Sequence, residues 1–132
     1  MIKIKGIGVD IVNNKRIYES LKNKNFIKKV FSKTEIKKSK KLRNKLGYFS
    51  KRFAAKESLS KSIGTGFKMG LNFKDIEVFN DKMGKPYFHL NNKIKKFISK
   101  KLNIKNYDLF LSISDEKDYS IAFTIIQNKN AK

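Results

Sequence analysis

The pattern of apolar and polar positions predicts strands at both ends of the chain. Residues 2–12 alternate partly and are rich in Ile and Val, and Gly6 and Gly8 mark a bend or a close backbone approach. Near the other end, residues 108–114 and 119–127 predict two strands joined by the tight turn DEKD. The last strand alternates between two faces, with Ile121, Phe123 and Ile125 on one and Ser120, Ala122 and Thr124 on the other.

Between these strands, apolar residues recur at helical spacing. A short helix is predicted at 14–21 with Asn13 or Asn14 as N-cap, and residues 45–63 form the longest helical pattern. SKTEIKK marks a further helix start, because Ser32 or Thr34 can cap ahead of Glu35. The remaining predicted elements are a helical turn at 26–31, a hairpin of strands Ile76–Asn80 and Pro86–Leu90, and a helix at 91–102.

Strands and helices are mixed without strict alternation, which favours an α+β fold over a doubly wound sheet. At 132 residues the chain is long enough for one domain with a hydrophobic core, so we expect a single domain at 1–132. It has no cysteine, and no apolar run approaches the roughly 18 residues of a membrane span. We therefore expect a soluble, cytoplasmic protein without disulfides.

The net charge of +21 would ordinarily indicate nucleic acid or another polyanion as partner. Only Arg16, Arg43 and Arg52 among the 32 basic residues are arginine, however, and arginine is the residue suited to bidentate phosphate recognition. Lysines are scattered along almost the whole chain, often beside asparagine. A compositional bias towards Lys, Asn and Ile fits this distribution, and so does a basic surface that attracts an acidic partner.

Two acidic side chains stand in unusual places. Asp10 interrupts GIGVDIV, a run that otherwise predicts a buried strand, and burying a carboxylate costs several kcal/mol unless a cation or several donors satisfy it. On the long helix, Glu57 lies about 40° from Phe53 in the apolar stripe. Two such carboxylates can converge on one divalent ion, and Mg²⁺ typically combines one or two protein carboxylates with phosphate oxygens. The pattern indicates phosphate chemistry.

Plainer explanations stay open for these residues. Glu57 and Lys61 have the i,i+4 spacing of an ordinary surface salt bridge, which is worth only about 0.3–0.5 kcal/mol. Asp10 also fits a residue at a strand end that caps the following helix.

Several basic residues lie along the same predicted helix. Arg52, Lys56 and Lys61 can all serve phosphate oxygens, together with the backbone amides of GTG at 64–66. GTG alone is a weak indication, because glycine just past a helix end is also the ordinary helix stop. The single histidine, His89, has no partner in view, so a structural or surface role is expected and a nucleophilic triad has no support.

Four blocks occur in a fixed order along the chain: GIGVDIV followed shortly by Arg16, then KRFAAKESLSKSIGTG, IEVFNDKMGKPYF and LSISDEKDYSIAF. In this order and spacing they resemble the bacterial holo-[acyl-carrier-protein] synthases, the small class of 4′-phosphopantetheinyl transferases. The similarity spans about residues 4–126. RFAAKES…KSIGTG is highly specific, whereas the lysine-rich stretches 33–45 and 91–106 contribute little.

The resemblance implies a small antiparallel sheet packed against a long central helix. It also implies transfer of the phosphopantetheine arm of coenzyme A to a serine of acyl carrier protein, with release of adenosine 3′,5′-bisphosphate, in fatty acid biosynthesis. Members of this family resemble one another in forming homotrimers whose coenzyme sites are shared between adjacent subunits.

Residue by residue, the resemblance implies that Asp10 and Glu57 bind Mg²⁺ and that Lys61 neutralises the pyrophosphate. These three would form the catalytic set. Either Glu57 or a metal-bound water could serve as base for the serine, and the sequence does not choose between them.

The resemblance also implies binding residues outside this set. Arg52 looks like a ligand for a phosphate of the nucleotide, and Gly64 and Gly66 belong to the coenzyme-binding GTG segment with Lys61. Arg16, with neighbouring basic residues, looks like the docking surface for the acidic carrier protein.

One position departs from the family's pattern. The family usually has histidine after the S-x-S/T of its penultimate strand, and here that residue is Asp115. An aspartate cannot donate to a phosphate and repels it. Either its side chain turns away and a lysine such as Lys117 substitutes, or it joins the metal site, or activity is reduced; we favour the first.

Two other functions are kept as alternatives. A nucleic-acid-binding module would bind RNA or DNA with steep salt dependence and indifferently to magnesium and Asp10. The chain has no RNP-like aromatic pattern and few arginines, which disfavours specific recognition. A degenerate homologue that binds coenzyme A without turnover is the other alternative, because of Asp115.

Overall fold

The structure is a computed structural model that describes residues 2–64 and 71–129. Every strand and helix predicted with bounds is present to within two residues, and the 3-10 turn η2 is an addition. The elements are β1 (Lys3–Asn13), α1 (Asn14–Ser20), α2 (Lys24–Val30), α3 (Lys33–Ser39), α4 (Lys45–Ile63), η2 (Phe73–Asp75), β2 (Ile76–Asn80), β3 (Pro86–Leu90), α5 (Asn92–Leu102), β4 (Tyr107–Asp115) and β5 (Tyr119–Asn128).

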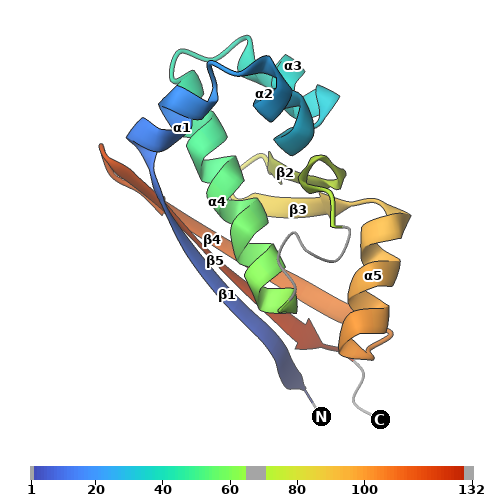
Figure 1. Cartoon of the computed structure of the whole chain (residues 1–132). Helices are drawn as coiled ribbons and strands as arrows, with labels where there is room; N and C mark the ends of the chain where they lie inside the picture. Colours follow the sequence, from blue (N-terminus) through green and yellow to red (C-terminus); the bar gives the residue numbers. More distant parts are fainter. Residues whose placement is uncertain (1, 65–70, 130–132) are drawn as a thin grey trace.

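The predicted α+β fold is confirmed, with small antiparallel sheets and a long helix. Strands β1, β5 and β4 form one antiparallel sheet in that order, and β2 and β3 form a separate hairpin. Figure 1 shows α4 lying along the three-stranded sheet, with α1, α2 and α3 gathered at one end of the molecule and α5 near the other. No helix in the described part of the chain is long and apolar enough to cross a membrane.

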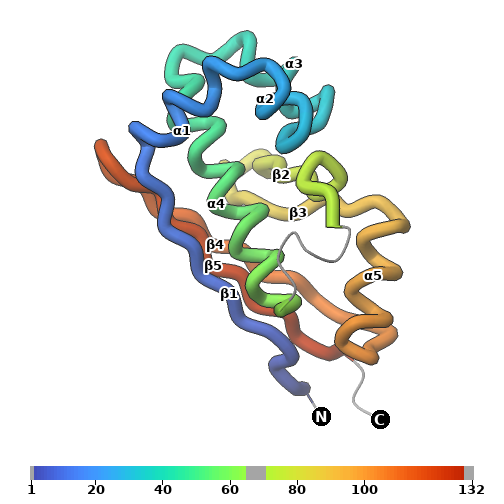
Figure 2. The backbone as a smooth tube through the Cα atoms, viewed as in Figure 1, coloured from blue at the N-terminus to red at the C-terminus, as the bar shows by residue number. Residues whose placement is uncertain are grey.

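Two glycines let the backbone of β1 touch α4. A Cβ atom on Gly6 would lie 2.1 Å from the Ser62 carbonyl oxygen, and one on Gly8 would lie 2.0 Å from the Ser58 carbonyl oxygen. Only glycine fits this close approach, which Figure 2 shows as β1 running alongside α4. Because strand side chains alternate, Asp10 lies on the same face as the glycines and faces α4.

The two faces of the large sheet carry different side chains. The face against α4 combines the buried apolar residues Val12, Ala122 and Ile126 with the fully buried Ser120 and Thr124, and the hydroxyls of Thr124 and Ser58 lie 2.6 Å apart. The outer face carries the large apolar side chains, which are 38–60% exposed: Ile7, Val9, Ile11, Ile121 and Phe123. The expectation that GIGVDIV is otherwise buried is therefore wrong for these residues of β1, since they point away from the helix.

The helix ends follow the predicted caps. Asn13 caps α1 by accepting from the Lys15 amide, and Ser32 forms a complete capping box with Glu35 at the start of α3. Gly64 ends α4 in the left-handed conformation, at φ +92°.

Candidate active site

Asp10, Glu57 and Lys61 meet where β1 crosses α4. The Lys61 Nζ donates to the Asp10 Oδ1 at 3.0 Å and to the Val9 carbonyl oxygen at 3.2 Å. The Asp10 side chain is 14% exposed and that of Lys61 is 53% exposed. Among the described residues Lys61 forms its ion pair with Asp10 rather than with Glu57, so the i,i+4 salt bridge is not the arrangement adopted.

The electrostatics of this cluster favour a bound cation. Burial raises the pKa of Asp10, although the Lys61 ammonium lowers it. Burial also raises the pKa of Glu57, the negative charge of Asp10 raises it further, and Lys61 opposes both effects. This coupling means that the two carboxylates are close enough to repel each other. The Lys61 ammonium pairs with Asp10, which leaves the partly desolvated Glu57 carboxylate without an ion-pair partner among the described residues.

The donor set suits a magnesium ion that also holds a phosphorylated ligand. No group of three or more His, Cys, Asp or Glu residues that could hold a metal occurs in residues 2–64 and 71–129. The protein therefore offers two carboxylates here, and Mg²⁺ commonly completes such a site with water and substrate phosphates. Asp10 and Glu57 fit that role.

Arg52 lies at a second polar site, about 7.5 Å before Glu57 along the helix axis. Its guanidinium carbon is 3.7 Å from the centre of the Tyr48 ring, and its Nη2 donates to the Asn80 Oδ1 at 2.8 Å. Arg52 is only 6% exposed, and its Nε has no hydrogen-bond partner among the described residues. The adjoining cavity of about 460 Å³ is lined by Lys38, Leu42, Arg43, Asn44, Tyr48, Lys51, Arg52, Phe79 and Asn80.

This basic cavity suits an anion. The unpartnered Nε of Arg52 is a donor without an acceptor, and a phosphate oxygen would satisfy it. The sequence pattern predicts Arg52 at this site but does not predict Tyr48 or Asn80. Tyr48 could have been found from its i,i+4 spacing to Arg52 on the helix, whereas Asn80 approaches through the folding of β2 onto α4.

The prediction that Lys56 can serve phosphate oxygens is wrong. Its side chain is fully buried, and its Nζ donates to the Glu35 Oε1 at 2.7 Å, the Phe73 carbonyl oxygen at 2.8 Å and the Ile76 carbonyl oxygen at 2.6 Å. All three ammonium donors are used inside the protein. Lys56 differs in this from Lys61. Lys61 lies five residues later on α4 and points from its sheet-facing side towards Asp10.

Two of the other predicted binding residues, Arg16 and Gly64, lie in the described part of the chain. Arg16 is exposed on α1. Gly64 is the exposed C-cap of α4, while Gly66 lies outside the described residues.

Comparison with known proteins identifies the family. The model of the 4′-phosphopantetheinyl transferase superfamily matches residues 6–124. The chain belongs to this superfamily. Within it the chain is of the holo-[acyl-carrier-protein] synthase type, because it is 61% identical to the Pelagibacter ubique holo-[acyl-carrier-protein] synthase over 97% of this chain and 100% of that relative. The synthase of Wigglesworthia glossinidia brevipalpis is 44% identical, over 93% of this chain and 91% of that protein.

Solved structures of this transferase type have the same fold. The Neisseria meningitidis synthase superimposes with a TM-score of 0.84 at 33% identity, over 94% of this chain and 98% of that one. The Bacillus anthracis synthase, crystallised in complex with CoA (3′,5′-ADP), gives 0.79 at 31% identity, over 96% and 98% of the two chains.

Asp115, at the position where the transferase family usually has histidine, is exposed at the end of β4. Asp10 lies on β1, and the register Asp10–Ala122–Ile113 places β5 between β1 and β4. Two strand spacings amount to about 10 Å, so Asp115 does not join Asp10 and Glu57 within one protomer. Lys117, the substitute that we favoured, is also exposed, in the turn that follows β4.

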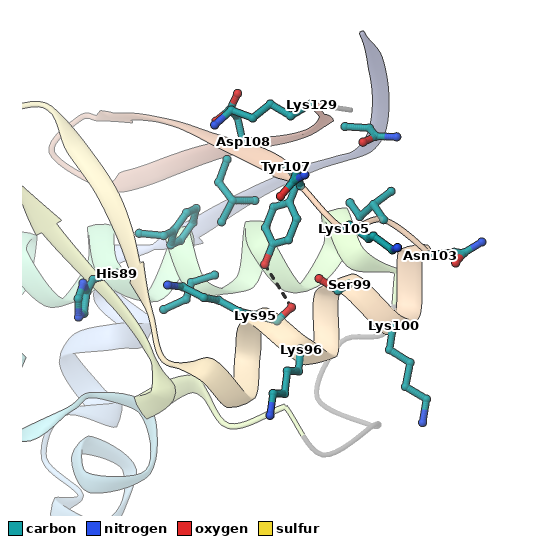
Figure 3. A pocket seen from close by; sticks show the side chains of 16 residues that line it. His89, Lys95, Lys96, Ser99, Lys100, Asn103, Lys105, Tyr107, Asp108 and Lys129 are labelled. Atoms are coloured by element: carbon teal, nitrogen blue, oxygen red, sulfur yellow. Dashed lines mark hydrogen bonds and ion pairs between the residues drawn. The ribbon is translucent and has the colours of Figure 1, made fainter. Parts of the chain in front are cut away.

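A larger cavity of this transferase, about 1030 Å³, contains none of the predicted catalytic residues. It lies between α5 and the start of β4, and Figure 3 shows the Tyr107 ring between them with its hydroxyl donating to the Lys95 carbonyl oxygen at 3.3 Å. Lysines surround it, but lysines cover much of this chain, and basic residues near a helix C-terminus also stabilise the helix dipole. His89 lies at its edge and is exposed, as a surface role requires.

Proposed function

We propose that this protein transfers the 4′-phosphopantetheine group of coenzyme A to a serine of apo-acyl carrier protein, in a Mg²⁺-dependent reaction that releases adenosine 3′,5′-bisphosphate. The serine oxygen forms a bond to the phosphorus that carries pantetheine, the serine proton passes to a base, either Glu57 or a water, and the bond from that phosphorus to the oxygen bridging the pyrophosphate breaks. The names of the similar synthases and the CoA complex of the Bacillus anthracis enzyme support this substrate pair.

The convergence of Asp10, Glu57 and Lys61 is the observation that carries the proposal. Mg²⁺ held by Asp10 and Glu57 would supply charge stabilisation at the pyrophosphate oxygens. The Lys61 ammonium is half exposed beside these carboxylates, so it can turn from Asp10 to a phosphate and neutralise charge on the leaving group.

The Arg52 cavity is the second part of the proposed coenzyme site. Coenzyme A carries a pyrophosphate and a ribose 3′-phosphate, and the pyrophosphate is assigned to Asp10, Glu57 and Lys61. The 3′-phosphate is then the group left for Arg52, whose buried Nε lacks an acceptor among the described residues. Gly64 and Gly66 are proposed to approach the coenzyme through their backbone, as the GTG motif suggests.

The outer face of the large sheet supports a homotrimer. Ile7, Val9, Ile11, Ile121 and Phe123 form a band of exposed apolar side chains on neighbouring strands, and such a band favours burial against another subunit. We propose that further copies of this chain cover it and share the coenzyme sites.

We also propose that 1–132 is one domain, and that the enzyme is cytoplasmic and acts in fatty acid biosynthesis. Arg16 is proposed to help dock the acidic carrier protein.

Conversion of apo to holo carrier protein tests the function directly. Incubation with coenzyme A and Mg²⁺ should add the mass of phosphopantetheine to the carrier serine, and omission of Mg²⁺ should abolish the gain. Asp10→Ala and Glu57→Ala should each lower the rate by at least about 10³-fold while the protein stays folded. Wild-type rates in both variants would refute the metal assignment. Salt-sensitive RNA binding without any transfer would instead favour the nucleic-acid-binding alternative.

A further inference from the structure

The Glu35 and Lys56 side chains form a buried ion pair that the proposed reaction does not use. Both are fully buried, with 2.7 Å between Nζ and Oε1. The Glu35 carboxylate also accepts from the Ser32 amide at 3.0 Å and, through Oε2, from the Val78 amide at 2.9 Å. Burying two charges is costly, and it is tolerated here because each has a full set of hydrogen-bond partners.

These partners join the pair, which bridges α3 and α4, to two further elements, η2 and β2. Lys56 lies on α4, and its carbonyl acceptors belong to Phe73 in η2 and Ile76 at the start of β2. Glu35 lies on α3 and holds the Val78 amide of β2. The first half of β2 is therefore bonded to α4 at one end of the pair and to α3 at the other.

Three of these elements, α3, α4 and β2, also line the Arg52 cavity. Strand β2 continues for two residues beyond Val78 to Asn80, whose Oδ1 accepts from Arg52. The Tyr48 ring under the Arg52 guanidinium is held by its hydroxyl, which donates to the Glu35 carbonyl oxygen at 2.8 Å. The strand that carries Asn80 is thus anchored by the side chains of Glu35 and Lys56, and Tyr48 is anchored by the main-chain carbonyl of Glu35.

We propose that Glu35 and Lys56 are positioning residues for the coenzyme 3′-phosphate: their side chains fix β2, and with it Asn80, against α3 and α4, so that Arg52 faces the cavity in one orientation. This inference rests on the proposed assignment of the 3′-phosphate to Arg52. A misplacement of about 1 Å in a binding group can cost about 10²-fold, so release of β2 should weaken recognition of this one phosphate.

Binding of coenzyme A and of dephospho-coenzyme A, which lacks only the 3′-phosphate, tests the inference by calorimetry. Wild type should prefer coenzyme A by about 10- to 100-fold, the range of one to two charge-assisted hydrogen bonds. Glu35→Gln with Lys56→Met removes both charges, keeps similar volumes and should abolish most of the preference, with the dephospho-coenzyme A affinity kept within about threefold. In the transfer assay, KM for coenzyme A should rise and kcat should change little.

The matched control is Asp108→Asn with Lys129→Met, which removes an exposed pair of the same charges and should keep the preference. Should the buried double variant fail to fold by circular dichroism, Lys56→Arg keeps the charge, changes the geometry and serves the same comparison. Equal weakening of both ligands, or an unchanged preference, would overturn the inference while the proposed function stands. A wild type with no preference would overturn the 3′-phosphate assignment, and the inference with it.

Discussion

Two lysines of helix α4 form ion pairs with carboxylates of other elements, and the two pairs share their chemistry but differ in their surroundings. Lys61 lies 3.0 Å from Asp10 and is 53% exposed, whereas Lys56 lies 2.7 Å from Glu35 with both side chains fully buried. Lys56 has three acceptors inside the protein, so it has no donor left for a ligand. Lys61 can exchange its partners with solvent or substrate. The difference teaches that burial, more than residue type or motif position, decides which charge on this helix is structural.

Stability should separate the two pairs most strongly. Lys56→Met leaves the Glu35 carboxylate buried without its cation, and breaking a buried pair in this way costs about 3–5 kcal/mol of unfolding free energy. Lys61→Met should cost less, about 1 kcal/mol, because the Lys61 side chain is 53% exposed and the Asp10 side chain, at 14% exposed, keeps some contact with water. Urea unfolding of both variants measures the difference, and equal losses would break the comparison.

Catalysis should separate the pairs in the opposite direction. Lys61→Met should lower kcat/KM for transfer by about 10²- to 10³-fold, since an ammonium that stabilises developing charge is removed. The mass-shift assay with purified carrier protein gives this number. Lys61→Arg keeps the positive charge and should recover part of the rate; a Lys61→Met enzyme as fast as wild type would show that this lysine serves the fold alone.

The pH dependence of metal binding should distinguish the two pairs further, because only the Lys61–Asp10 pair includes a proposed metal ligand. Burial raises the pKa values of Asp10 and Glu57, and a protonated carboxyl does not coordinate a cation. Magnesium affinity should therefore fall as pH is lowered, beginning at a higher pH than for freely exposed carboxyls. The fall approaches about tenfold per pH unit for each proton that must leave.

Calorimetric titration with Mg²⁺ across this pH range, with coenzyme A present throughout, measures the effect. Glu57→Gln provides the control, since it removes one titrating ligand and should leave a weaker, shallower dependence. An affinity that stays constant down to about pH 4, the ordinary range of free Asp and Glu, would contradict the raised pKa values.

The smallest effect is expected at Asp115, which lies outside both pairs. Asp115→His should leave the transfer rate unchanged or raise it, because the aspartate is exposed and two strands away from Asp10. Lys117→Met should lower the rate if that lysine substitutes for the family's histidine. A large loss in Asp115→His would show that the aspartate has acquired a role of its own.

Local patterns predicted most of the fold. Alternation and helical spacing located the strands and helices. The Ser32 capping box and the Gly64 helix stop could be predicted because each depends on residues close in sequence. The exposed outer face of the large sheet and the short helix η2 could not be predicted from local patterns. An apolar residue such as Val9 fits a buried strand in sequence, because sequence does not distinguish a side chain buried in its own fold from one exposed on an outer face.

The candidate site was predictable in its residue types and less so in its partnerships. Asp10 stood out because a carboxylate in an apolar strand needs a reason, and the structure brings it to Lys61. The burial and structural role of Lys56 depend on its contacts with Glu35 and Ile76, which lie about 20 residues before and after it in sequence. Local spacing does not encode such contacts. Short-range rules therefore placed the charged groups and left their roles to tertiary structure.

The contact of β1 with α4 at Gly6 and Gly8 has a consequence for how this enzyme can vary. Main-chain atoms, which no rotamer change can move aside, already set the separation of strand and helix at its lower limit, so a methyl group at either glycine can only push them apart. A methyl group at either glycine would therefore move Asp10 away from Glu57 without altering either side chain. Sequence change can alter the proposed ion site by replacing its side chains, but not by bringing the strand closer to the helix.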